Sequence, residues 1–205
     1  MELILGTGNP GKIKELRSLL AGTGVDILSP AEIDLKLKVR ESGLNYLENA
    51  VLKARAYAAA GGRWALADDT GLEVDPLEGA PGLFSARYAP GTEATDADRR
   101  AHLLDNLQGY QRPWKAHFVC TVALAHPSGD LYHTRGICRG EIIPEERGER
   151  GFGYDPVFLI SEAGKTMAEL SLEEKNQLSH RARAVKAILP QIIQIRDTRR
   201  GRQSG

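Results

Sequence analysis

The first part of the chain alternates short apolar runs with a helical stripe. Residues 3–5 form an apolar run that predicts a buried strand. Asn9 and Pro10 follow, and they indicate a helix start because asparagine caps a helix and proline suits its first turn. The apolar stripe of this helix consists of Ile13, Leu16, Leu19 and Leu20. The chain therefore opens with a strand, a tight turn and a helix.

Apolar runs and helical stripes continue to alternate as far as residue 107. Residues 25–28 predict a second strand, residues 45–60 an alanine-rich helix that ends at Gly61 and Gly62, and residues 64–67 a third strand. The section 71–91 is rich in glycine and proline, which is typical of a shaped loop. Residues 96–107 have the pattern of another helix. This alternation is typical of an α/β fold.

The last part of the chain has a different pattern. Residues 116–125 and 131–143 are rich in β-forming residues, and the turn residues 126–130 between them predict a hairpin. Residues 179–195 predict a closing helix. The tail 197–205 is basic and rich in Arg, Gln, Ser and Gly, so we expect it to be disordered. The expected organisation is one domain over residues 1–196, followed by this tail.

Composition excludes several classes of protein. The 205 residues are 41% hydrophobic, enough for a substantial core, and the 27 basic residues equal the 27 acidic ones. With no net charge, we expect neither a nucleic acid nor a membrane surface as partner. No leader sequence and no apolar run of roughly 18 residues is present, so we expect a cytoplasmic location. Cys120 and Cys138 lack metal-binding spacing and are expected in the core.

A glycine-rich turn follows the first strand and reads GTGNPGK from Gly6 to Lys12. It matches both the dinucleotide pattern and the P-loop pattern, but each match is incomplete. Ile13 replaces the hydroxyl residue that a P-loop needs, and Asp26 begins its strand where a dinucleotide site needs an acid at the strand end. Both patterns share a helix N-terminus that binds phosphate, here reinforced by Lys12. The alternative is an ordinary turn with a surface lysine.

Two adjacent carboxylates, Asp68 and Asp69, follow the third predicted strand. Neighbouring strand residues point to opposite faces, so the two carboxylates must lie in different environments. A divalent cation is the usual companion of bound phosphate, and Asp69 with Glu41 could hold magnesium. The alternative is that Asp69 caps the turn at Thr70 and that Glu41 is solvated.

Two further motifs carry candidate ligand contacts. Residues 151–156 read GFGYDP, in which Phe152 could lie against a planar ligand and Asp155 could accept from ring N–H groups. A core phenylalanine beside a turn is the alternative. Ser179 would cap the last helix, and Lys175, His180 and Arg181 place cations near its start. Cations there oppose the helix dipole, so something negative should lie beside them unless the helix start is simply solvated.

Six motifs in this order resemble one family. They read TGNPGK at 7–12, ESGLNYLENAVLKA at 41–54, ADDTGLEVD at 67–75, GAPGLFSARY at 79–88, FGYDP at 152–156 and SHR at 179–181. Together they resemble the Ham1-type inosine/xanthosine triphosphate pyrophosphatases, from residue 3 to about residue 195. This resemblance implies an elongated mixed sheet with flanking helices that form two lobes around a central cleft.

The resemblance also implies the activity and the residues that perform it. The expected enzyme is a magnesium-dependent homodimer that hydrolyses inosine, deoxyinosine and xanthosine triphosphates to the monophosphate and pyrophosphate, which removes them from the nucleotide pool. Asp69 would be the general base and, with Glu41, a metal ligand. Carried over by motif, the residues that would contact the substrate are Thr7, Gly8, Asn9, Pro10, Gly11, Lys12, Thr70, Phe152, Gly153, Tyr154, Asp155, Lys175, His180 and Arg181.

The expected mechanism is in-line attack of water on the α-phosphorus. Asp69 or the metal would promote loss of the water's proton, and Lys12 with magnesium would stabilise the pyrophosphate leaving group. Asp68 would brace the loop, and His180 with Arg181 would donate to the 6-oxo group of the base. Two rival hypotheses are a nucleotide-binding regulatory module without turnover and a P-loop phosphotransferase.

Overall fold

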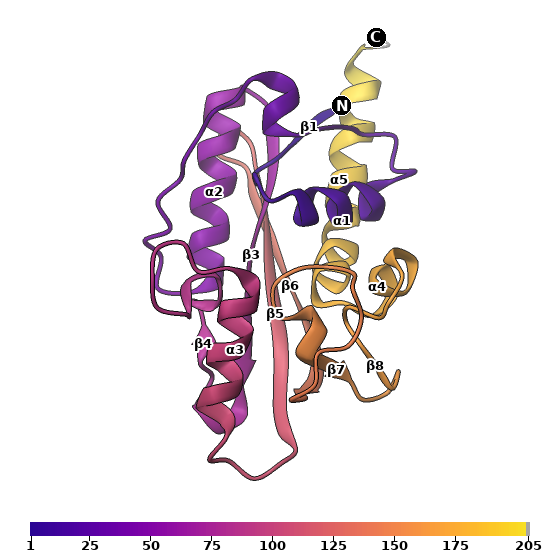
Figure 1. Cartoon of the computed structure of the whole chain (residues 1–205). Coiled ribbons are helices and arrows are strands. Elements are labelled where there is room, and N and C mark those ends of the chain that lie inside the picture. The colour runs from indigo at the N-terminus through magenta and orange to yellow at the C-terminus, as the bar shows by residue number, and fades with distance from the viewer. Residues whose placement is uncertain (204–205) are drawn as a thin grey trace. The chain divides into compact units, whose positions relative to one another are not determined.

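The computed structural model describes the backbone of residues 1–203 and the side chains of residues 1–198. It is a mixed α/β fold whose chain divides into two compact units (Figure 1). Unit 1 contains Met1–Asp69, Cys120–Gly136 and the segment that begins at Arg181. Unit 2 contains Thr70–Val119 and Ile137–His180. Within the described residues, no helix is both long and apolar enough to cross a membrane.

The strands form one mixed hydrogen-bonded array. They are β1 (Glu2–Leu5), β2 (Asp26–Leu28), β3 (Trp64–Val74), β4 (Pro81–Gly82), β5 (Trp114–Ala125), β6 (Leu131–Ile142), β7 (Phe158–Ile160) and β8 (Lys165–Thr166). Neighbours follow the order β2-β1-β3-β5-β6-β7-β8, and β4 pairs with β3. β1 is parallel to β2 and β3, whereas β7 is antiparallel to β6 and β8. The α-helices are α1 (Pro10–Leu20), α2 (Tyr46–Gly61), α3 (Asp96–Leu107), α4 (Leu172–Leu178) and α5 (His180–Gln203).

In unit 1, helices cover both faces of the parallel strands. Leu3 and Leu5 of β1 pack in one cluster with apolar side chains of α1 and α5. Ile4, between them in sequence, packs on the other face with the alanines of α2. Figure 1 shows α2 on one side of β3 and α1 with α5 on the other. The period-2 alternation of a strand therefore gives unit 1 two cores, one on each face.

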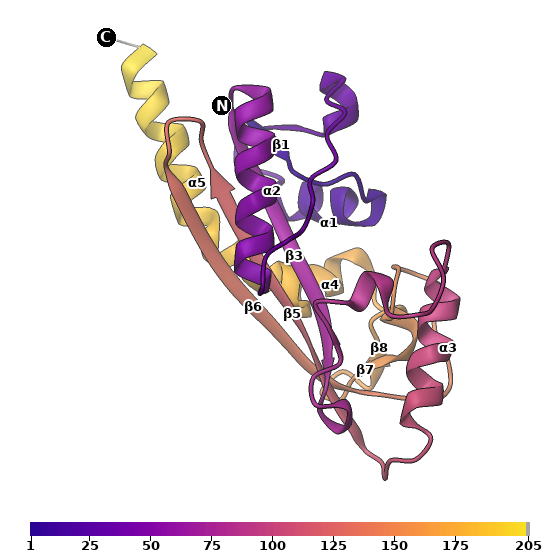
Figure 2. The same ribbon diagram turned by 90° about the vertical axis from the view of Figure 1, so that its left-hand side faces the viewer.

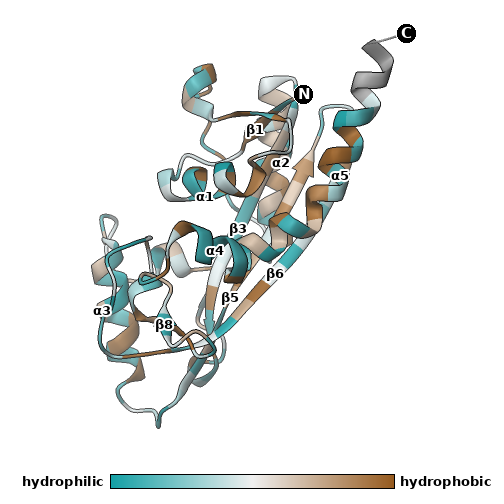
Figure 3. Ribbon diagram, turned by 90° about the vertical axis from the view of Figure 1, so that its right-hand side faces the viewer, coloured by the Kyte–Doolittle hydropathy of each residue, from teal (hydrophilic) through white to brown (hydrophobic). Residues whose placement is uncertain are grey.

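α5 is fixed in unit 1 by both polar and apolar contacts. The Thr134 hydroxyl of β6 donates to the carbonyl of Ala184 at 2.6 Å. Figure 2 shows α5 running beside β6, and Figure 3 shows brown, hydrophobic segments on α5 between hydrophilic ones. Val185, Ile188 and Ile192 supply the apolar contacts. These contacts hold the start of α5, where Arg181 lies.

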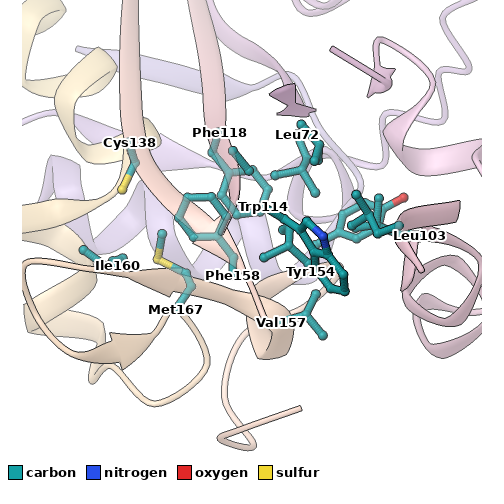
Figure 4. Packing of buried hydrophobic residues seen from close by; sticks show 14 of the residues in the cluster. Leu72, Leu103, Trp114, Phe118, Cys138, Tyr154, Val157, Phe158, Ile160 and Met167 are labelled. Carbon is teal, nitrogen blue, oxygen red and sulfur yellow. The ribbon is translucent and has the colours of Figure 1, made fainter. Parts of the chain in front are cut away.

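The core of unit 2 is rich in aromatic side chains (Figure 4). The rings of Phe118 and Phe158 lie 4.6 Å apart between centroids. Tyr154 is buried in this core, and its hydroxyl donates to the carbonyl of Ser85 at 2.8 Å. Burial raises the pKa of Tyr154 well above its ordinary value, so its hydroxyl stays protonated as a structural donor.

Several expected elements are confirmed. The helix expected at 96–107 is α3 with the same bounds, and the expected hairpin is β5 with β6. Asn9 caps α1, because its side chain accepts from the N–H of Lys12 at 3.1 Å. Gly62 ends α2 in the left-handed conformation, at a φ of 64°. Cys120 and Cys138 are free and buried, as expected.

Other elements differ from the expectation. β3 continues to Val74, so Asp68 and Asp69 lie inside a strand and not at its end. Its pairing with β1 stops at Leu66, but the strand goes on because Leu72 pairs with β4. α4, β7 and β8 are short, and hydrophobic periodicity does not reveal elements of two to seven residues.

The C-terminal tail also needs correction, whereas the expected cap of the last helix by Ser179 stays a prediction. Ser179 ends α4, because its N–H donates to the carbonyl of Lys175, and it directly precedes His180, the first residue of α5. The expected disordered tail begins inside a helix, since α5 continues to Gln203. A helix that is already nucleated extends at little cost through residues such as Arg and Gln. Residues 204–205 lie outside the described part of the chain.

Candidate functional site

The glycine-rich turn of unit 1 leads from β1 into α1. Its backbone bends back on itself, because the N–H of Thr7 donates to Leu5 and the N–H of Gly6 donates to Leu66 of β3. The Thr7 hydroxyl accepts from the N–H of Asn9 at 3.2 Å. These bonds place the first turn of α1, with its outward N–H groups, directly after the parallel strand. The turn therefore has the arrangement that binds phosphate at a helix N-terminus.

Asp68 is the centre of a buried ion network. Its side chain is fully buried, and its Oδ2 lies 2.9 Å from Nζ of Lys12 and 3.2 Å from Nη2 of Arg181. Arg181 also pairs with Glu15 of α1. Burial by itself would raise the pKa of Asp68, but Lys12 and Arg181 outweigh it and hold that pKa far below its ordinary value. Asp68 therefore ties the starts of α1 and α5 to β3.

Asp69 faces a different set of groups, supplied by α2. Its Oδ1 lies 2.9 Å from Nζ of Lys53, and its Oδ2 accepts from the amide of Asn49 at 3.3 Å. Nζ of Lys53 also lies 2.6 Å from Oε1 of Glu41. Burial raises the pKa of Asp69 above its ordinary value in spite of Lys53. The prediction that the adjacent carboxylates occupy different environments is confirmed.

Sequence reasoning missed Asn49 and Lys53 as members of this site. Asn49 is buried, and its Oδ1 accepts from the N–H of Gly43 at 2.8 Å, two residues after Glu41. One amide thus holds both the Glu41 segment and Asp69. The available signal was the spacing, since Asn49 and Lys53 are four residues apart and share one face of α2.

In unit 2, the loop 151–155 wraps around the carboxylate of Asp155. Oδ2 of Asp155 lies 2.6 Å from Nζ of Lys175 and accepts from the N–H of Phe152 at 3.2 Å. Gly151 has a φ of +85°, and a Cβ there would lie 2.0 Å from the same oxygen. The N–H of Gly153 donates to Asp96 at 2.7 Å. The candidate ligand contact Asp155 is therefore held by the chain itself.

The ring of His180 also has a defined neighbour in unit 2. It stacks on Phe118 with centroids 4.7 Å apart and an interplanar angle of 16°. Both side chains are buried, and Phe118 in turn packs on Phe158. The imidazole of His180 is thus held in one plane by the aromatic core.

Thr70, another expected substrate contact, is half-buried and follows Asp69 in β3.

The cations expected to contact the substrate also have partners within the protein. The ammonium of Lys12 pairs with Asp68. The buried guanidinium of Arg181, which is expected to donate to the base, is bound by Asp68 and Glu15. The negative partners expected for the cations near α5 are therefore the protein's own carboxylates. Tyr154, expected among the substrate contacts, lies in the core of unit 2.

Comparison with known proteins gives this site its context. The model of the Ham1 family matches residues 3–191. The chain belongs to the Ham1 family. It is 48% identical over 192 residues to the dITP/XTP pyrophosphatase of Thermus thermophilus, covering 92% of this chain and 90% of that protein. It is 46% identical to the dITP/XTP pyrophosphatase of a Synechocystis species, over 92% of this chain and 94% of that protein.

A solved Ham1 structure shares the fold. The HAM1 protein from Coxiella burnetii has a TM-score of 0.84 and is 36% identical, covering 95% of this chain and 99% of that chain. The expected mixed sheet with flanking helices is confirmed. The roles of the site residues in this Ham1 chain remain predictions. Variants of Asp68 and Asp69 test the roles of these two carboxylates separately.

The first prediction is that Asp68→Asn and Asp69→Asn change stability in opposite ways. Asp68→Asn should lower the free energy of unfolding at pH 7 by about 3 kcal/mol or more, because it leaves buried cations without their main partner. Asp69→Asn should leave it unchanged or raise it, because burial disfavours the charged carboxylate. Urea unfolding of both variants measures this difference, and equal losses would contradict it.

The pH dependence follows from the same pKa shifts. The folded-state pKa of Asp68 is depressed, so its stabilisation is present above the ordinary aspartate value of about 3.9 and is lost as the pH falls below it. The folded-state pKa of Asp69 is raised, so its penalty begins as the pH rises above the ordinary aspartate value and is complete above the folded-state pKa. Wild type and Asp68→Asn should therefore approach each other in stability in acid.

The second prediction separates the packing of the glycine-rich turn against β3 from its proposed binding of phosphate. A Cβ on Gly6 would lie 2.8 Å from Cβ of Ala67, so Gly6→Ala should lower the free energy of unfolding by about 1–3 kcal/mol. Gly8 has open space around its Cβ position, so Gly8→Ala should keep stability within about 0.5 kcal/mol.

If the turn binds phosphate, the methyl group that Gly8→Ala adds would crowd the ligand. Gly8→Ala should then reduce kcat/KM for inosine triphosphate by roughly 10- to 100-fold. Thermal unfolding and steady-state kinetics on both variants check this. Unchanged kinetics in Gly8→Ala would exclude close contact between this part of the turn and the substrate.

Proposed function

We propose that this Ham1 chain hydrolyses inosine, deoxyinosine and xanthosine triphosphates to the nucleoside monophosphate and pyrophosphate. The proposal rests on one observation above all: the glycine-rich turn that leads from β1 into α1 lies beside β3, the parallel strand that carries a buried carboxylate of raised pKa. The names of the relatives support it, since they are dITP/XTP pyrophosphatases. Removal of these nucleotides from the nucleotide pool is the corresponding role.

Magnesium is the metal that we propose, and the donor set fits it. Within the described residues, no three His, Cys, Asp or Glu side chains gather as a metal site. Glu41 and Asp69 nevertheless converge on one cation, the ammonium of Lys53. Magnesium in nucleotide enzymes is commonly held by one or two carboxylates, with water and phosphate oxygens completing its shell. When bound, it would supply positive charge to the triphosphate oxygens.

The side chains of unit 1 have distinct roles in this reaction. Asp69 takes the proton of the attacking water, and its raised pKa makes it a stronger base than an ordinary aspartate. Asn49 fixes the orientation of that carboxylate. The N–H groups at the start of α1 bind phosphate oxygens, and Lys12 stabilises the pyrophosphate that leaves. Asp68 acts through Lys12 as a positioning residue.

We assign selection of the base to unit 2. Hypoxanthine and xanthine carry a 6-oxo acceptor, whereas adenine carries an amino donor at that position. His180 and Lys175 supply N–H donors, and Phe152 offers a ring that could lie against the purine. Guanine shares the 6-oxo group, so its 2-amino group must be excluded by the shape of the loop 151–155. Arg181 contributes indirectly, through its ion pair with Asp68.

The proposal includes a homodimer that acts in the cytoplasm. The family resemblance supports the dimer, and the substrate class supports the location, because the nucleotide pool is found there. A molar mass equal to that of a monomer, measured by light scattering on the purified chain, would contradict the dimer. The rival phosphotransferase would transfer label from ATP to an acceptor, and Ile13 in place of a hydroxyl residue argues against it. A regulatory module would release no pyrophosphate.

The third prediction concerns Asp69 as the general base. Asp69→Asn should lower kcat for inosine triphosphate by about 100- to 10,000-fold, which is the usual contribution of a general base. The fold should persist, because the volume is nearly unchanged. Pyrophosphate release at saturating magnesium measures the rate, and Asp105→Asn, an exposed aspartate of α3, is the matched control. More than about a tenth of the wild-type rate in Asp69→Asn would exclude this role.

The fourth prediction separates His180 from its neighbour Arg181. Wild type should prefer inosine and xanthosine triphosphates over ATP and GTP by about 10,000-fold, because a mismatched base leaves polar groups unpaired. His180→Leu should narrow the preference over ATP by lowering kcat/KM for inosine and xanthosine triphosphates, whose 6-oxo group would lose its donor. Arg181→Lys should lower kcat/KM for all four nucleotides by a similar factor, because Arg181 pairs with Asp68.

The measurement is kcat/KM for the four nucleotides in the three proteins. If His180→Leu keeps the wild-type ratio and Arg181→Lys narrows it, the base is selected by Arg181 and the assignment of roles is reversed. If neither variant changes the ratio, Phe152 and the loop around Asp155 become the selective elements.

A further inference from the structure

The ammonium of Lys53 lies between the two candidate metal ligands. Its Nζ is 2.6 Å from Oε1 of Glu41 and 2.9 Å from Oδ1 of Asp69. The side chains of Lys53 and Asp69 are only 12% and 11% exposed, so water screens the interaction weakly. The ammonium of Lys53 is therefore a cation shared by two carboxylates.

The surroundings of this cation are fixed without any metal. Asn49 binds Oδ2 of Asp69, which leaves Oδ1 facing Lys53. The same amide accepts from the N–H of Gly43 and so ties the segment of Glu41 to α2. Asn49 and Lys53 lie one turn apart on that helix. The carboxylate pair is thus preorganised around an internal positive charge.

A divalent ion and this ammonium compete for the same two oxygens. Magnesium binds oxygen at about 2.0–2.1 Å, which is closer than the N···O distances of an ammonium. With the ammonium still seated, the metal would lie beside a second positive charge in a poorly screened site. One cation must therefore leave when the other binds.

We propose that Lys53 is a built-in counter-ion that holds Glu41 and Asp69 in the metal-free protein and is displaced by the metal. The inference rests on the proposed metal site of the pyrophosphatase. The displaced ammonium needs a new anionic partner, and the phosphate chain of a nucleotide provides one. Metal and nucleotide consequently bind cooperatively, and the metal alone binds weakly.

The test is calorimetric titration of Mn²⁺ into the nucleotide-free protein at pH 7.5. Lys53→Met should bind Mn²⁺ about tenfold more tightly than wild type, within the usual range of coupling between sites. Arg55→Met is the matched control, because Arg55 is an exposed cation on the same helix, and its Mn²⁺ affinity should stay within about twofold of wild type. Equal or weaker binding by Lys53→Met would overturn the proposal.

A second measurement uses wild type alone, so that the proposal remains testable if Lys53→Met does not fold. A non-hydrolysable inosine triphosphate analogue should raise the Mn²⁺ affinity of the protein beyond that of the analogue alone by about tenfold. No increase would overturn the proposal. Asp69→Asn tests the metal site itself. If this variant binds Mn²⁺ as tightly as wild type, the proposed metal site is wrong. If it no longer binds Mn²⁺ while Lys53→Met binds no more tightly than wild type, only the proposed role of Lys53 is wrong.

Discussion

Two carboxylates that follow one another in a strand must point to opposite faces, and unit 1 depends on this constraint. Asp68 is fully buried, and a charge in that position is tolerated only if cations meet it. Lys12 and Arg181 meet it from α1 and α5, two helices that are far apart in sequence. The position of the glycine-rich turn, which we propose binds phosphate, therefore depends on an aspartate that is not the proposed base.

Asp69 shows the opposite balance on the other face of the strand. Its neighbours on α2 include one ammonium, which it shares with Glu41, and burial prevails in setting its pKa. A carboxylate of raised pKa costs stability at neutral pH, but it accepts a proton more readily. Asp68 and Asp69 thus separate two demands, structural anchoring and the proposed proton transfer, that a single carboxylate could not meet together.

The sequence predicts the parts of this arrangement that depend on local physics. The cap of α1 by Asn9 and the separation of the two aspartates follow from helix ends and strand alternation alone. The partners of Arg181 do not follow, because they lie on elements distant in the chain. The role of Lys53 was missed for the same reason: its spacing from Asn49 places both on one face of α2, whereas its approach to Glu41 exists only in the folded unit. Tyr154 lies in the FGYDP motif, but its side chain is part of the core of unit 2, which only the packing reveals.

The glycines of the motifs are explained by side chains that approach the backbone. Gly6 is excluded from bearing a Cβ by Ala67, the residue before Asp68, whereas Gly8 in the same turn has open space. Gly43 is crowded by Asn49, which orients Asp69, and Gly151 is crowded by Asp155. The GTGNPGK turn resembles two nucleotide-binding patterns, but its first glycine is required by the passage of β3. Glycine at position 6 is therefore explained by the packing of Ala67 and Tyr57 against the turn, independently of any ligand.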